Sequence, residues 1–133
     1  MAVKRFTIYG IELEDRPGSL QELLAQAASA NVDLQCFEAF SAGGGRGGVY
    51  VGAKDTKAFE AFIEDAGIEA TAAAGFIVSG KDKVGAAAEA MKKLADADIN
   101  GVAGSAMVCD GKYQMLIVVL AADGDAAAKA MGA

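Results

Sequence analysis

The sequence contains no histidine. Without an imidazole, a Ser-His-Asp triad, a Cys-His pair and a histidine metal ligand are all excluded. The two cysteines, Cys36 and Cys109, are too few to form a zinc site or a disulfide framework. We therefore expect two buried thiols in a reducing compartment, and neither a metal nor another cofactor.

Basic residues and long apolar runs are also scarce. The 133 residues include 12 Lys and Arg against 18 Asp and Glu, which gives a net charge of −6. Because nucleic acids and anionic membranes attract clustered positive charge, neither is an expected partner. The longest apolar run, residues 115–122, is too short to span a membrane, and no secretory signal follows Met1. The sequence predicts a cytoplasmic protein.

One pattern occurs twice in the chain at a constant offset. The stretch Asp15-Arg-Pro-Gly18 has its counterpart in Asp82-Lys-Val-Gly85, and the apolar positions that follow keep the same spacing as far as Val49 and its counterpart Leu116. A hydrophobic content of 53% supports a folded core. We predict two copies of one unit, a first domain over residues 1–73 and a second over residues 74–133.

Apolar periodicity predicts the same order of strands and helices in both copies. The order β-α-β-β-α-β is typical of the ferredoxin-like fold, an antiparallel sheet with helices on one face, and the fold class is therefore α+β. The second copy lacks its final strand, which leaves a sheet edge open unless another chain or a strand of the first copy covers it. We expect a homo-oligomer, most simply a dimer. The expected strands are residues 4–13, 32–40, 49–53, 68–72, 75–80, 99–109 and 113–121, and the expected helices begin at residues 17, 56, 84 and 125.

The best candidate for chemistry is the turn before the first helix. Pro17 suits the first helical position, and Ser19 with Glu22 matches a capping box. Free N–H groups at Gly18, Ser19 and Leu20 would attract a carboxylate or phosphate, and Asp15 would attract an ammonium group. An amino acid has both charges. The simpler alternative is a strand-to-helix turn with no ligand.

This turn resembles that of the ACT domain family. The family's first turn typically reads Asp-x-Pro-Gly-x-Leu, as residues 15–20 do here, and its second strand often opens as Asn31-Val-Asp33 does. The chain resembles the paired ACT domains of aspartokinases and, since no kinase domain precedes it, free-standing two-ACT proteins. The resemblance implies an amino-acid site between two domains. Its residues would be Asp15, Arg16, Pro17, Gly18, Ser19, Leu20, Asn31, Val32 and Asp33.

The second copy and the glycine-rich segment depart from known binding motifs. Val84 replaces the proline and Ala87 the leucine, so we expect no ligand at the second turn. The run from Gly43 to Gly48 lacks the Gly-Lys-Ser/Thr ending of a phosphate-binding loop. We expect a flexible hairpin loop with a solvated Arg46 at its tip.

The sequence is compatible with three functions. The first is a regulatory protein that senses an amino acid at a domain or subunit interface. The second is a regulatory subunit that docks onto a metabolic enzyme without a ligand of its own. The third is an enzyme, which we do not expect because no nucleophile is visibly paired with a base.

Overall fold

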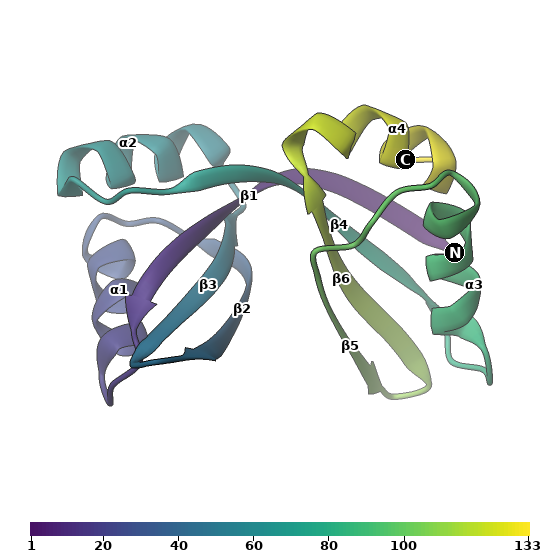
Figure 1. Ribbon diagram of the computed structural model, residues 1–133, viewed down its shortest axis with the longest axis horizontal. Coiled ribbons are helices and arrows are strands. Elements are labelled where there is room, and N and C mark those ends of the chain that lie inside the picture. The colour runs from purple at the N-terminus through teal and green to yellow at the C-terminus, as the bar shows by residue number, and fades with distance from the viewer. The chain divides into compact units, whose positions relative to one another are not determined.

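The computed structural model describes all residues 1–133, and it is an α+β structure of six antiparallel strands and four helices (Figure 1). The strand order is β2-β3-β1-β4-β6-β5, so β2 and β5 are the two edge strands. No helix is long and apolar enough to cross a membrane. The elements are β1 (Ala2–Glu14), α1 (Ser19–Ser29), β2 (Leu34–Gly43), β3 (Arg46–Ala53), α2 (Thr56–Ala66), β4 (Thr71–Lys81), α3 (Ala86–Asp96), β5 (Ala103–Cys109), β6 (Lys112–Leu120), a 3-10 turn (Ala121–Asp123) and α4 (Gly124–Met131).

The chain divides into two compact units. One comprises residues 7–72, and the other combines residues 1–6 with residues 73–133. The domains expected from the sequence instead place residues 1–6 in the first domain. The difference arises because β1 is longer than the expected strand, and Val3 near its start packs against the core of the later unit.

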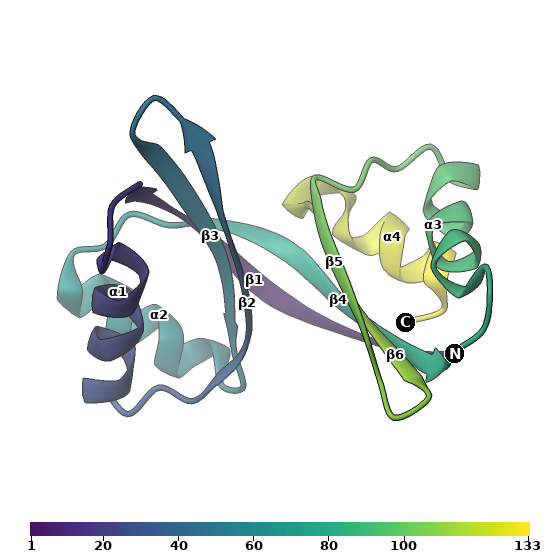
Figure 2. The ribbon, with the colours of Figure 1, turned by 90° about the horizontal axis from the view of Figure 1, so that it is seen from below.

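In the unit of residues 7–72, helices α1 and α2 lie on the same face of β1, β2 and β3 (Figures 1 and 2). Strand β3 pairs antiparallel with both neighbours, so that Ile11 lies opposite Val49 and Tyr9 opposite Val51. These alternate positions all point toward the helices. The buried core consists of Tyr9, Ile11, Leu23, Ala27, Val32, Val49, Val51, Ala53, Phe59 and Phe62.

In the other unit, helices α3 and α4 lie on one face of β4, β6 and β5 (Figure 2). Strand β6 pairs antiparallel with β4 and with β5. The two units have separate cores, since no buried residue belongs to both. This second core consists of Ala74, Phe76, Val78, Ala86, Ala90, Leu94, Ile99, Tyr113, Met115, Ile117, Val119, Ala127 and Met131.

The constant offset found in the sequence relates the backbones of both units from their first strands to their edge strands. Gly18 and Gly85 both adopt a left-handed conformation, with φ of 91° and 88°, directly before α1 and α3. Asn31 and Asp98 follow these helices with φ of 58° and 57°. Left-handed residues of this kind turn the chain sharply at a helix end. The same local geometry therefore recurs at the spacing found in the sequence.

The same offset, continued without a gap, is wrong for β3 and β6, the strands that follow the edge strands in the chain. Val49 points into its core, and the constant offset would match it to Leu116, but the core residue at the matching place is Met115. A register shift between Ser41 and Gly43 in β2 supplies the extra residue, as a β-bulge does. A one-residue slip moves every side chain to the opposite face of a sheet, so burial reveals the change.

Three further details differ from expectation. The two strands expected at residues 68–72 and 75–80 form one strand, β4. Most of the glycine-rich segment is strand, with only Gly44 and Gly45 left to form a tight turn at φ of 63° and 74°. Cys36 is half-buried, but Cys109 is exposed at the end of β5, so the expectation of two buried thiols is wrong.

Candidate ligand-binding site

The β1–α1 turn is fixed at both ends by backbone hydrogen bonds. Asp15 N–H donates to the Gly45 carbonyl at 2.9 Å, which ties the turn to the tip of the β2–β3 hairpin. Gly18 caps α1 in a left-handed conformation that a residue with a Cβ adopts only with strain. The helix begins at Ser19, two residues later than the start expected at Pro17. The turn is thus a defined structure that exposes the first turn of α1.

Several N–H groups at the start of α1 have no acceptor within the chain. Those of Gly18, Leu20 and Gln21 make no hydrogen bond, whereas the Ser19 N–H, expected to be free, donates to the Arg16 carbonyl at 3.3 Å. No side chain caps the helix, so the expected capping box is wrong. Together with the helix dipole, the free donors favour an anion at this position.

Arg16 is held between two carboxylates. Its Nε donates to Glu14 at 2.8 Å, and its two Nη atoms donate to Glu22 at 2.8 and 3.2 Å. These hydrogen bonds raise the pKa of Arg16 and lower the pKa of Glu22. Glu22 is therefore engaged with Arg16 instead of the helix cap. The carboxylate of Asp15 has no partner and is free to bind a cation.

A hollow of about 290 Å³ lies beside this turn. Four of the predicted site residues line it, namely Asp15, Arg16, Ser19 and Leu20. The β2–β3 hairpin forms the remaining wall, with Ala39, Phe40, Ser41, Gly47 and Gly48. Of the residues with a free N–H group, Leu20 lines this space, together with Asp15 and its unpaired carboxylate. The space is large enough for a small molecule.

Pro17 and Gly18 belong to the turn but do not line the hollow, and Asn31, Val32 and Asp33 lie at the opposite end of α1. A helix of 11 residues spans roughly 16 Å, and Asn31 follows its last turn. Val32 is buried in the core, and the Asp33 carboxylate accepts from Lys54 Nζ at 2.8 Å. One chain therefore does not bring residues 31–33 together with the β1–α1 turn.

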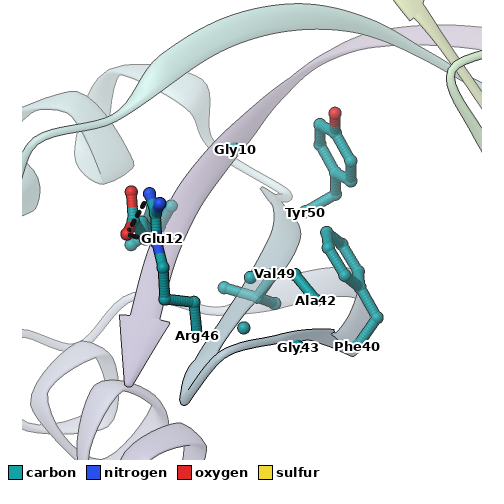
Figure 3. A pocket seen from close by; sticks show the side chains of 11 residues that line it. Gly10, Glu12, Phe40, Ala42, Gly43, Arg46, Val49 and Tyr50 are labelled. Carbon is teal, nitrogen blue, oxygen red and sulfur yellow. Dashed lines mark hydrogen bonds and ion pairs between the residues drawn. The ribbon is translucent and has the colours of Figure 1, made fainter. Parts of the chain in front are cut away.

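A second hollow, of about 330 Å³, was not predicted (Figure 3). The ring of Phe40 lies over Gly48 and the ring of Tyr50 over Gly10, with 6.2 Å between the ring centroids. Arg46 Nη2 lies 2.6 Å from Glu12 at its edge, and the arginine side chain is exposed to solvent, as expected. Alternate residues of a strand share a face, so the sequence could have placed Phe40 and Tyr50 together if residues 43–48 had been expected to form strand instead of a flexible loop.

Other reactive groups are engaged in structure. Tyr9 donates to Glu60 Oε1 at 2.6 Å, and burial together with this hydrogen bond raises the Tyr9 pKa. Burial also raises the pKa of the Cys36 thiol, which lowers its reactivity. No group of three or more Asp, Glu and Cys side chains is placed to hold a metal ion.

Comparison with known proteins gives a fold but no close relative. No protein-family model and no curated protein matches the sequence. Among solved structures, a protein from Bacteroides thetaiotaomicron is similar over 96% of this chain and 88% of its own, with a TM-score of 0.73 at 16% identity. The ligand-free regulatory subunit of aspartate kinase from Thermus thermophilus covers 98% of this chain and 93% of its own, with a TM-score of 0.66 at 17% identity. A putative C-terminal regulatory domain of aspartate kinase from Porphyromonas gingivalis covers 98% and 94%, at 0.58 and 15%.

Proposed function

We propose that this protein is a regulatory protein of the ACT type that senses an amino acid at the β1–α1 turn. The observation on which the proposal depends is the hollow at that turn, which is lined both by Asp15, whose carboxylate is unpaired, and by Leu20, whose N–H group is free. The regulatory subunits and domains of similar fold support a regulatory role. No catalytic activity is part of the proposal.

The charges at the turn suit a zwitterion. The α-carboxylate of an amino acid would accept from the N–H groups of Gly18 and Leu20, where the helix dipole favours negative charge. The α-ammonium would lie against Asp15. Arg16, already bound by Glu14 and Glu22, would position the rim of the site instead of binding the carboxylate directly.

The full site would form between two copies of the chain. Asn31, Val32 and Asp33 are too far along α1 to meet the same ligand within one chain, so a second copy would supply them. We accordingly propose a cytoplasmic homodimer built from two ferredoxin-like repeats per chain. Ligand bound across such an interface would shift the packing between the copies, which is how occupancy becomes a signal.

A thermal-shift screen against the twenty amino acids, with nucleotides as controls, tests the proposal. A ligand at a hundredfold its Kd adds about 2.7 kcal/mol to the free energy of unfolding. For a chain of this size the midpoint should rise by roughly 5 to 20 °C. We expect a rise with one amino acid or a related pair. No rise with any amino acid at millimolar concentration would refute amino-acid sensing.

The alternative is a regulatory subunit that docks onto a metabolic enzyme without a ligand. Its specific support is that one similar structure is a separate regulatory subunit of an enzyme. An acidic surface would favour a basic patch on that enzyme. Pull-down of one stoichiometric enzyme partner, with affinity that falls as salt rises and that no amino acid changes, would favour this alternative.

A further inference from the structure

The hollow of about 330 Å³ that the sequence did not predict lies on the face of the sheet away from α1 and α2. Successive strand residues point to opposite faces, and Val49 of β3 points into the core beneath the helices. Its neighbours Gly48 and Tyr50 therefore point the other way, as do their cross-strand partners Phe40 and Gly10. We call this side of β1, β2 and β3 the outer face. All residues that line the hollow belong to the same compact unit.

Aromatic rings form one side of this hollow, and a carboxylate stands on the other side (Figure 3). The rings of Phe40 and Tyr50 are inclined at 34° with their centroids 6.2 Å apart. Rings this close leave no room for a flat ring between them, so a ligand has to lie alongside them. Across the hollow, Arg46 donates to Glu12 Oε1 from both Nε and Nη2, at 2.7 and 2.6 Å. The second oxygen of Glu12, Oε2, is left without a hydrogen bond within the chain.

A second carboxylate on the outer face is unpaired. Glu38 lies directly opposite Tyr50 across the β2–β3 pair, and its Oε2 is shielded from water but has no hydrogen-bond partner. A polar atom in this state is costly, and nearly all such atoms in proteins have a partner. Since Arg46 balances the charge of Glu12, the charge of Glu38 is uncompensated. A cation seated against Tyr50 would offset it.

The other unit has equivalent strands but none of these side chains. The repeat and the strand registers match the two outer faces position by position, and every aromatic, acidic and small residue of interest is replaced. The matched pairs are Phe40 and Met107, Tyr50 and Leu116, Gly10 and Ile77, Glu12 and Ser79, and Glu38 and Ser105. The fold therefore requires neither rings laid over glycines nor two carboxylates at these positions.

We propose that the hollow on the outer face binds a weakly hydrated organic cation, a quaternary ammonium or a guanidinium group. Such a cation is attracted by the face of an aromatic ring within about 6 Å of its centroid, and Phe40 and Tyr50 offer two rings. Glu12 Oε2 and Glu38 supply the opposite charge. Because Gly10 has no side chain, the cation can reach the floor of the hollow. The proposal does not depend on amino-acid binding at the β1–α1 turn.

The first experiment compares a cation with its uncharged analogue by NMR titration at constant ionic strength. Choline and ethylguanidinium are the two cations, and 3,3-dimethylbutan-1-ol is the analogue of choline in which carbon replaces the charged nitrogen. We expect saturable binding of at least one cation with a millimolar Kd, and binding of the neutral alcohol about tenfold weaker or less. The cation that binds more tightly identifies the ligand group. No saturable binding of either cation, or equal binding of the alcohol and choline, overturns the proposal.

A second experiment places the cation on the outer face. Tyr50→Leu introduces the residue that the other unit has at this position, and Glu38→Gln removes a charge at constant size. Glu64→Gln is the matched control, because Glu64 is an exposed glutamate of α2 on the opposite face. We expect Y50L and E38Q each to weaken binding about fivefold or more and E64Q to leave it unchanged.

The native chain gives a test that does not rely on the variants folding. Nuclear Overhauser effects should connect the ligand protons beside the cationic group with the ring protons of Phe40 and Tyr50. Their absence at saturation overturns the placement. An equal loss of affinity in E64Q and E38Q would mean that the overall negative charge of the chain holds the cation, which overturns the proposal as well.

Discussion

The turns before α1 and α3 have the same backbone but different chemistry. Each is capped by a left-handed glycine, and in each a basic side chain reaches forward to a glutamate in the following helix. Arg16 pairs with Glu22 at 2.8 Å, and Lys83 pairs with Glu89 at 3.2 Å. These shared features fix the backbone conformation of the turn, so they indicate a common fold and give no evidence for a ligand.

The differences concern charge and shape around the glycine. The position of Glu14 is occupied by Lys81 in the second unit, which replaces a carboxylate with an ammonium group. Pro17 is replaced by Val84, whose side chain is fully exposed. Asp82 keeps the carboxylate of Asp15, so the two turns differ in the charge of the residue before this aspartate and in the proline. For these reasons we place the proposed amino-acid site at the first turn.

The largest predicted effect separates the two turns directly. Gly18→Asp adds a negative charge where the ligand carboxylate would lie, and we expect binding of the amino acid found by thermal shift to weaken at least a hundredfold. Gly85→Asp is the matched control, since it has the same left-handed strain, 88° against 91°, and open space around its Cβ. Isothermal titration calorimetry measures both. Equal losses in the two variants would assign the effect to strain, and no loss in G18D would remove the site from this turn.

The two cores use the same helix positions with the sizes exchanged. Leu23 and Ala27 of α1 correspond to Ala90 and Leu94 of α3, and all four are buried. We expect Leu94→Ala to cost about 2–5 kcal/mol of unfolding free energy, because it leaves a cavity. Adding Ala90→Leu should recover part of this loss if the two positions share one space. Urea unfolding measures both free energies. A double variant no more stable than L94A would show that a leucine at position 90 does not fill the space left at position 94.

The sequence was sufficient to predict the helices and their turns. It was not sufficient to predict how segments that are distant in the chain come together. Periodicity and turn residues placed all four helices within about two residues of their observed bounds. They did not show that β4 continues through the expected domain boundary, since Ala72–Ala74 suits a strand or a linker equally well. Likewise, Asp15 and Asn31 are individually visible in the sequence. Only the length of α1 shows that one chain keeps them apart.

A smaller effect concerns Tyr9 and Phe76, which occupy the same core position in the two units. Tyr9→Phe removes the hydrogen bond to Glu60 and should cost about 0.5–1.5 kcal/mol at neutral pH. Because the pKa of Tyr9 is raised in the folded state, its contribution is complete below the unfolded value of about 10 and is lost as the pH rises above it. The free energy of unfolding, measured at increasing pH, should therefore fall more steeply for the native chain than for Y9F. Parallel curves would contradict the raised pKa.

The smallest effect tests whether arginine or merely positive charge organises the first turn. Arg16 binds both oxygens of Glu22, whereas Lys83 reaches one oxygen of Glu89. The paired geometry lowers the Glu22 pKa, so its stabilising contribution is present above about pH 4.3 and disappears as the pH falls below it. Arg16→Lys should move the Glu22 titration, followed by NMR of the side-chain carboxyl, back toward the ordinary value. Both groups are exposed, so overall stability should scarcely change. An unmoved titration in R16K would mean that positive charge alone sets the pKa, and that the two turns are more alike than their geometry suggests.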